Sequence, residues 1–231
     1  MLFSLDDTPA GAPFPDPSLA ETEPDGLLAI GGDLSSERII QAYRQGIFPW
    51  YSETQPILWW SPDPRMVLFP HKLRINRSLN KVLRRNCFEL SVDRAFPEVI
   101  EACAQPRADD EGTWLMPEMI VAYNKLHRLG VAHSVEAWQN GELVGGLYGN
   151  ALGRVFFGES MFTRVANASK VAFATLVQAL HNRGYEVIDC QVFTAHLQSL
   201  GAEMIPRQAF LQMLNQSVNQ ETDFPDELSC A

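Results

Sequence analysis

Cysteine is scarce in this sequence, and its spacing indicates neither a disulfide framework nor a zinc site. The four cysteines, Cys87, Cys103, Cys190 and Cys230, are scattered and form no CxxC pair. The five histidines form no HExxH motif, and neither GxSxG nor GxxxxGK(S/T) occurs. These absences argue against a metalloenzyme, a hydrolase with that motif and a P-loop protein, so the sequence predicts neither a metal nor a cofactor.

A targeting or membrane-spanning segment is also missing. Residues 1–17 show no basic stretch followed by an apolar one, and no run reaches the roughly 18 apolar residues that a spanning helix needs. The 231 residues are 46% hydrophobic and 20% charged, which is typical of a globular protein with one large or two modest domains. We therefore expect a cytoplasmic protein without a membrane partner.

Acidic residues are absent from one segment of an otherwise acidic chain. The formal net charge is −10. Residues 64–88 nevertheless carry only basic charges, on Arg65, Lys72, Arg74, Arg77, Lys81, Arg84 and Arg85. Such a strip can bind phosphates, or it can be the solvated face of a helix over residues 78–86. The tryptophans just before it favour nucleic acid.

Tryptophan and proline are concentrated in residues 46–65, which read GIFPWYSETQPILWWSPDPR. Four prolines fix φ and remove backbone donors, so the sequence predicts a stiff, turn-rich segment instead of a strand or a helix. Trp50, Trp59 and Trp60 either fill a core between two domains or form a platform on which a base stacks.

The chain divides near residue 65. We predict a small, loop-rich N-terminal domain (1–65), with one clear helix from Ser35 to Gln45, and a second domain (66–231). In the second domain we expect helix 117–129, strands 131–138, 142–148 and 154–162, helix 167–183, strand 186–192, and helices 194–200 and 206–218. Residues 221–231 are expected to fray. This α+β order resembles the GNAT acyltransferase core, with a mixed, mainly antiparallel sheet.

Two apolar strands carry polar residues that are candidates for chemistry. Alternation along strand 186–192 puts Asp189 and Gln191 on one face and Cys190 on the other. Such polar groups need partners or a task, so their role is either catalytic or structural. Glu159 lies beside Gly158 in the aromatic strand FFGESMF, where it either binds a cation or ammonium group or pairs with an arginine.

Glycine is missing from the link TRVANASK (163–170), between the third strand and the next helix. GNAT enzymes that use coenzyme A have a glycine-rich turn there, whose backbone N–H groups hold the pyrophosphate. A coenzyme A donor is therefore disfavoured. An acyl group linked to a nucleotide, held by basic residues and tryptophan stacking, fits better.

Several long motifs, in order, resemble those of the leucyl/phenylalanyl-tRNA–protein transferase family. They are GLLAIGGDL (26–34), GIFPWY (46–51), ILWWSPDPR (57–65), GTW (112–114), LVGGLYG (143–149), FGESMF (157–162), NASK (167–170) and DCQ (189–191). The resemblance covers residues 14–216. It implies a small N-terminal domain joined to a GNAT-like domain. It also implies transfer of Leu or Phe, less readily Met, from aminoacyl-tRNA to the α-amino group of proteins beginning with Arg or Lys, which marks them for N-degron degradation.

The resemblance also implies roles for single residues. Asp189 and Gln191 would be the catalytic pair, with Glu159 near the reacting amine. The implied binding residues are Trp50 and Trp114 for the terminal adenosine, Arg84 and Arg85 for tRNA phosphate, and Phe156, Gly158, Met161, Leu176 and Leu180 for the amino-acid side chain. As members of the same basic strip, Arg77 and Lys81 are also expected to bind tRNA. Family members often carry Phe where Leu176 and Leu180 stand, which leaves the preference between Leu and Phe open.

The transfer reaction that the resemblance implies needs no metal or cofactor, because an aminoacyl ester is already activated. Positioning of the two substrates can supply much of the rate. The attacking α-amine has an ordinary pKa of about 7.7–8 and must lose a proton before it attacks. An ordinary Asp, with a pKa of about 3.9, is a weak base. We therefore expect Asp189 to hold and polarise the amine, and Gln191 to orient it or donate to the developing oxyanion.

Two other functions are compatible with the residues alone. One is a GNAT N-acyltransferase that uses a coenzyme A thioester. The other is a tRNA-binding module without catalytic activity, in which Asp189 and Gln191 belong to the core. Transfer of labelled Leu from Leu-tRNA to a protein that begins with Lys or Arg separates all three.

Overall fold

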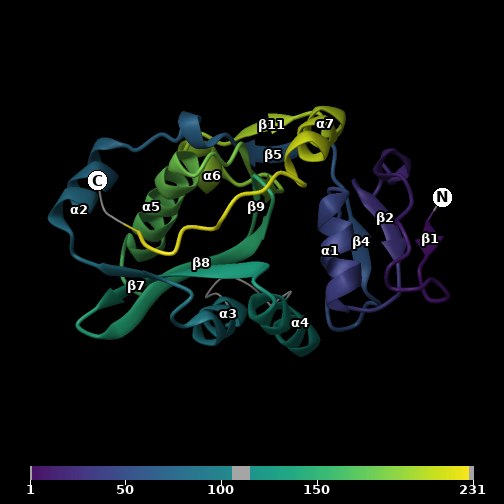
Figure 1. Cartoon of the computed structure of the whole chain (residues 1–231), viewed down its shortest axis with the longest axis horizontal. Helices are drawn as coiled ribbons and strands as arrows, with labels where there is room; N and C mark the ends of the chain where they lie inside the picture. Colours follow the sequence, from purple (N-terminus) through teal and green to yellow (C-terminus); the bar gives the residue numbers. More distant parts are fainter. Residues whose placement is uncertain (1, 106–114, 229–231) are drawn as a thin grey trace.

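The computed structural model describes residues 2–105 and 115–228, which form two β-sheets (Figure 1). The smaller sheet comes from the first 60 residues, and the larger one takes the strands from residue 65 onward. A single apolar cluster joins the two parts, since Leu28 and Trp59 of the small sheet belong to the same cluster as Val67 and Phe157 of the large one.

The small sheet has the strand order β1-β2-β4-β3. Its strands are β1 (Phe3–Ser4), β2 (Leu27–Ile30), β3 (Phe48–Pro49) and β4 (Leu58–Trp60). The expectation that the proline-rich segment forms no strand is therefore wrong, because Phe48 and Pro49 pair with Trp60 and Trp59. The ladder tolerates Pro49 because β3 is an edge strand, where a missing N–H donor costs little.

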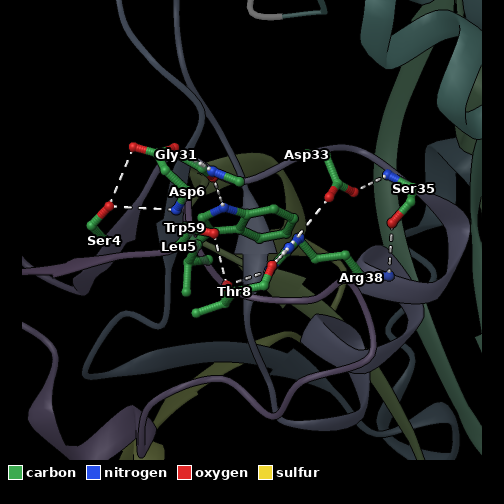
Figure 2. Close-up of polar contacts among 10 residues, drawn as sticks. Ser4, Leu5, Asp6, Thr8, Gly31, Asp33, Ser35, Arg38 and Trp59 are labelled. Atoms are coloured by element: carbon green, nitrogen blue, oxygen red, sulfur yellow. Dashed lines mark hydrogen bonds and ion pairs between the residues drawn. The ribbon is translucent and has the colours of Figure 1, made fainter.

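A buried arginine ties the N-terminal segment to this sheet, as Figure 2 shows. Arg38, on helix α1 (Ser36–Arg44), is 2% exposed and donates to the Thr8 carbonyl at 2.7 Å and to Asp33 at 3.3 Å. The Trp59 indole donates to the Gly31 carbonyl at 3.0 Å. Trp59 is thus fixed within the core of the small sheet.

The large sheet has seven strands in the order β11-β5-β10-β9-β8-β7-β6. They are β5 (Arg65–Leu68), β6 (Glu89–Val92), β7 (Ala132–Gln139), β8 (Glu142–Leu152), β9 (Val155–Thr163), β10 (Val187–Gln191) and β11 (Glu203–Ile205). Among the described strands of this sheet, β9 and β10 form the one parallel pair. The predicted α+β class with a mixed, mainly antiparallel sheet is confirmed, as is the β-β-β-α-β-α order expected of a GNAT-like core.

Helices cover both faces of this sheet (Figure 1). Helix α5 (Ala168–Asn182) lies on one side, and α3 (Phe96–Ala104) and α4 (Pro117–Arg128) lie on the other. The remaining helices are α2 (Arg77–Arg85), α6 (Ala195–Ser199) and α7 (Arg207–Ser217), with short 3-10 turns at Pro17–Leu19 and Pro70–Lys72. Within the described ranges, none of these helices has the length and apolar character needed to cross a bilayer.

The C-terminal segment packs against the protein, so the expectation that it frays is wrong for its described part, residues 221–228. The Phe224 ring stacks on His133, with centroids 4.1 Å apart, and lies 5.7 Å from the Phe156 ring. Asp226 pairs with Arg183 at 2.8 Å. The acidic composition of this segment led to the expectation of fraying, but one aromatic contact and one ion pair fix it to the protein.

Candidate active site

Strands β9 and β10 pair over only three residues and then separate. At that point both strands carry a β-bulge. The extra residue in β9 is Glu159, which lies between Gly158 and Ser160 and has no opposite residue in β8. The extra residue in β10 is Cys190. Because bulges bend a strand and re-aim its side chains, the two neighbouring bulges place these residues at a gap in the sheet.

The end of β10 is locally strained. Gln191 has a φ of 64°, in the left-handed region that non-glycine residues seldom adopt. Its backbone N–H donates to Oδ1 of Asp189 at 2.9 Å, which helps to hold the turn. Cys190 packs in the apolar cluster around α5, whereas Asp189 and Gln191 bond to Arg65 and Glu159. The bulge at Cys190 interrupts the simple alternation expected along this strand.

Asp189 is half of a buried ion pair. Arg65 donates from Nε to Oδ1 at 2.8 Å and from Nη2 to Oδ2 at 2.7 Å, and the two side chains are 1% and 0% exposed. The guanidinium also lies over the rings of Phe48 and Phe210, 4.8 and 4.9 Å from their centroids. Arg65 therefore does not belong to the basic surface strip. Its partner Asp189 is positioned to orient Gln191 and is not a free base.

Glu159 lies at the centre of a second polar cluster. Tyr43 of α1 donates to its Oε1 at 2.6 Å, Tyr123 of α4 donates to its Oε2 at 3.0 Å, and the Gln191 side-chain amide donates to Oε1 at 3.2 Å. Burial raises the pKa of Glu159 to about 7, helped by the charge of Asp189 and opposed by the two tyrosine hydrogen bonds. Both the protonated and the ionised form of Glu159 are therefore accessible near neutral pH.

The number of protons available in this cluster also favours a protonated Glu159. The hydroxyl oxygens of Tyr43 and Tyr123 are also in hydrogen-bond contact, so Tyr43, Tyr123 and Glu159 make three mutual contacts. The two hydroxyls supply only two protons. Burial and the nearby Glu159 charge raise the pKa of both tyrosines, so neither ionises near neutrality. A proton on Glu159 completes the ring of three hydrogen bonds.

The gap between β9 and β10 opens into an apolar cavity of about 350 Å³. Besides Glu159, Ser160 and Gln191, its walls are formed by Leu147, Tyr148, Phe156, Gly158, Met161, Phe173, Ile188, Cys190, Val192, Thr194, His196 and Leu197. Phe156, Gly158 and Met161, three of the five residues expected to line the amino-acid pocket, thus line this cavity.

Leu176 and Leu180 do not line this cavity, which corrects their expected place. Both are fully buried in the apolar cluster on α5. Helix α5 presents Phe173 to the cavity instead, about one turn before Leu176. The helical spacing predicts that these side chains share a buried face, but it does not show which turn of the helix reaches the strand gap.

Gly158 is a glycine that neither its backbone nor its packing requires. A Cβ built on it would meet only the Asp189 carbonyl oxygen, at an ordinary 3.6 Å, and its φ is not in the left-handed region. Gly149, its partner in β8, differs because a Cβ there would lie 2.2 Å from the Phe157 carbonyl oxygen. The glycine at 158 therefore keeps space open in the cavity.

The tryptophans of the proline-rich segment differ in exposure. Trp59 is fully buried, whereas Trp50 is 44% exposed with its ring 6.0 Å from that of Trp60. The Trp60 indole donates to the Trp50 carbonyl, which fixes the backbone under the exposed ring. Trp114, the other residue expected to contact adenosine, lies outside the described residues.

The basic residues expected to bind tRNA lie together on α2. Arg77, Lys81, Arg84 and Arg85 are all exposed. No carboxylate within the described part of the chain forms an ion pair with any of them. The helix face is thus available to an anion, although exposure alone also fits a solvated surface.

Sequence reasoning missed Arg65, Tyr43, Tyr123 and Phe173 as site residues. Arg65 was counted with the surface charges because it comes just before them in sequence. The two tyrosines come from separate helices, and no local motif links them to Glu159. Phe173 was recognised only as part of the buried face of its helix.

These groups combine an apolar cavity with a proton acceptor of near-neutral pKa and an oriented amide. Such a site can accept a proton from an amine and hold an acyl group beside it. The described residues contain no group of three or more His, Cys, Asp or Glu side chains that could hold a metal ion.

The comparisons with known proteins agree on one family. The model of the leucyl/phenylalanyl-tRNA protein transferase family matches residues 67–215, and the model of its N-terminal domain matches residues 32–63. The chain is 61% identical over 206 residues to the leucyl/phenylalanyl-tRNA–protein transferase of Nitrosospira multiformis, covering 89% of each chain. It is 62% identical over 201 residues to that of Azotobacter vinelandii, covering 87% of this chain and 89% of the relative.

Solved structures show a more distant likeness. L-PGS from Bacillus licheniformis matches 73% of this chain and 54% of its own, with 13% identity and a TM-score of 0.40. A GCN5-related N-acetyltransferase-like protein from Streptococcus suis matches 74% and 64%, with 16% identity and a TM-score of 0.36. The assignment rests on the sequence matches, which cover both parts of the chain: it belongs to the leucyl/phenylalanyl-tRNA–protein transferase family of aminoacyltransferases.

Proposed function

We propose that this protein moves Leu or Phe, and less readily Met, from aminoacyl-tRNA to the α-amino group of cytoplasmic proteins that begin with Arg or Lys, and so marks them for N-degron degradation. The observation that carries the proposal is the apolar cavity that opens directly beside Glu159 and Gln191. The aminoacyl side chain occupies this cavity, and its ester lies at the gap between β9 and β10.

Glu159 accepts the proton that the incoming α-ammonium must lose. Its pKa of about 7 is close to that of the amine, about 7.7–8, which suits proton transfer near neutrality. The transferred proton completes the hydrogen-bonded ring with Tyr43 and Tyr123. The amine nitrogen then bonds to the ester carbon and the bond to the ribose oxygen breaks. The nitrogen gives up its second proton to that oxygen, and the first proton leaves Glu159 for solvent.

Gln191 orients the amine or donates to the developing oxyanion, while Asp189 acts through Gln191. Arg65 and the Gln191 backbone N–H both bond to the Asp189 carboxylate, so Asp189 fixes the strained turn that aims the amide. In the same proposal Trp50 and Trp114 contact the terminal adenosine, and α2 contacts tRNA phosphates.

The proposal is tested by incubating the protein with labelled Leu-tRNA or Phe-tRNA and model proteins that begin with Lys, Arg or Ala. Label should enter protein in a form that survives ester hydrolysis, and only with Lys or Arg. Acetyl-coenzyme A serves as the alternative donor, because the remaining competing function is a coenzyme A-dependent N-acyltransferase. Acetylation without aminoacyl transfer would support that function, and tRNA binding without transfer would support a non-catalytic module.

We expect Gly158→Ala to alter donor selectivity without destabilising the fold. The added methyl group meets no protein atom closer than 3.6 Å, so it only takes space from the cavity. Transfer of Phe should fall more than transfer of Leu, within the roughly 10–200-fold range that one carbon can impose in an apolar pocket. Competition between Leu-tRNA and Phe-tRNA measures the ratio, and urea unfolding checks stability.

Leu180→Met is the matched control for this change. Leu180 is buried outside the cavity, so a swap of similar volume should leave the ratio unchanged. If Gly158→Ala leaves the ratio of Leu to Phe transfer unchanged, the apolar cavity does not bind the donor side chain. Donors with a branched β-carbon, such as Ile and Val, should already transfer poorly to the unmodified protein, and charged donors more poorly still.

We expect the double variant Arg84→Ala, Arg85→Ala to bind tRNA more weakly and with less dependence on salt. Each lost phosphate contact should reduce the slope of log affinity against log salt by roughly 0.7–0.9. Filter binding of tRNA over a series of salt concentrations measures the slope. The double variant Lys125→Ala, Arg128→Ala is the control, since it removes two exposed charges from α4. Equal slopes in all three proteins would place α2 away from the tRNA.

A further inference from the structure

A second, larger cavity adjoins the apolar one. It has a volume of about 540 Å³ and shares Met161 and His196 with the apolar cavity. Its other walls come from the ends of three elements: Ala102, Cys103 and Gln105 at the end of α3, Phe162, Thr163 and Arg164 at the end of β9, and Ser169 and Lys170 at the start of α5. We call this cavity the basic groove.

The charges in the basic groove have one sign. Arg164, Lys170 and His196 line it, and among the described residues no Asp or Glu does. Arg164 uses Nη1 to donate to the Leu143 carbonyl at 3.0 Å, and its guanidinium lies 5.3 Å from the Phe162 ring centroid. Lys170 is exposed and forms no ion pair with any carboxylate of the described ranges. Neither cation forms an ion pair within the described part of the chain, and Arg164 also borders a neighbouring pocket that Glu98 and Glu101 line.

His196 adds a neutral polar group between the two cavities. Burial, together with the positive charge of Lys170, lowers its pKa, so near neutrality it is an uncharged imidazole that can donate one hydrogen bond. A cationic acceptor side chain would be repelled by Arg164 and Lys170. A singly charged anion would instead be attracted to all three groups.

We propose that the basic groove binds the phosphodiester that joins the terminal adenosine of the donor to the nucleotide before it. This inference rests on the proposed function, since the ester must lie in the gap beside the apolar cavity. The groove starts where that cavity ends, so a chain that leaves the ester can pass along it. It is formed by the glycine-free link 163–170, so side-chain cations hold the phosphate here in place of a glycine-rich backbone turn.

The test compares two minimal donors that differ by one phosphate. Phenylalanyl-adenosine has none, and phenylalanyl-cytidylyl-adenosine has a single phosphodiester. In the unmodified protein kcat/KM should be higher for the dinucleotide donor. Lys170→Met should lower kcat/KM for the dinucleotide about 10- to 100-fold and leave that for the adenosine donor unchanged, because a hydrogen bond to a charged group is lost. Lys170→Arg should restore most of the loss.

Lys125→Met is the matched control, because Lys125 is an exposed lysine on α4, outside both cavities. An equal loss with both donors would show that Lys170 acts on the ester or the fold, and no loss with either would show that the groove is unused; each overturns the inference. If the unmodified protein transfers from neither donor nor from full-length Phe-tRNA, the proposed function itself fails.

Discussion

Replacing Asp189 with alanine should abolish most transfer activity and also lower the free energy of unfolding by about 3–5 kcal/mol. The stability loss follows from Arg65, whose guanidinium would remain buried without its carboxylate. The activity loss follows from Gln191, because its left-handed turn would lose the bond to Oδ1. Urea unfolding and single-turnover transfer measure the two effects separately.

A double variant distinguishes the two effects. Arg65→Met combined with Asp189→Leu replaces the ion pair with apolar side chains, a change that is often neutral or stabilising in buried sites. This variant should regain the unfolding midpoint but not the transfer rate. A Gln191→Ala variant should also lose transfer while keeping near-normal stability. If Asp189→Ala keeps its stability, or if the double variant is active, the positioning role of the ion pair is wrong.

Replacing Glu159 with glutamine should slow single-turnover transfer by about 10²–10⁴-fold, the range that general acid–base catalysis supplies. Glutamine keeps the shape of the side chain but cannot accept the proton of the amine. In the unmodified protein the rate should rise as the pH passes through about 7, where Glu159 deprotonates. The variant should keep only the pH dependence that comes from the amine, so the rate ratio of the two proteins over pH 5.5–8.5 isolates Glu159.

Stability should show the opposite dependence on pH. The pKa of Glu159 is raised from an ordinary 4.5 to about 7, so the folded state binds this proton more tightly than the unfolded state. The resulting stabilisation is fully present below about pH 4.5 and is lost as the pH rises to about 7. Glu159→Gln should lack this component, which urea midpoints at several pH values would show. Identical pH slopes for both proteins would mean that Glu159 titrates normally.

Local sequence signals identified most elements of the second domain. The hairpin turn at Asn140 and Gly141, both with positive φ, was predicted from two residues, and α5 ends where Gly184 adopts the left-handed conformation. Helix α3 and strands β5, β6 and β11 were not predicted. The three strands are short, and β5 is stabilised as a strand by pairing with β10 and β11, which are far away in sequence.

Only some of the site residues could be predicted from the sequence, again because the others depend on contacts between distant segments. Asp189, Gln191 and Glu159 stand out because they are polar residues in apolar strands. Their partners are ordinary in their own local context, since Tyr43 and Tyr123 read as buried helix residues and Arg65 reads as one more surface charge. The bulges that bring Glu159 and Gln191 together depend on strand register, which no local pattern specifies.

The C-terminal segment supports one wall of the apolar cavity from outside the region that the family model matches. The family model ends at residue 215, yet Phe224 supports Phe156 from behind, and Phe156 lines the apolar cavity. Relatives can therefore share every cavity-lining residue and still differ in how firmly that wall is held. On the proposed function, a truncation that removes Phe224 should change donor preference through a residue that does not line the cavity.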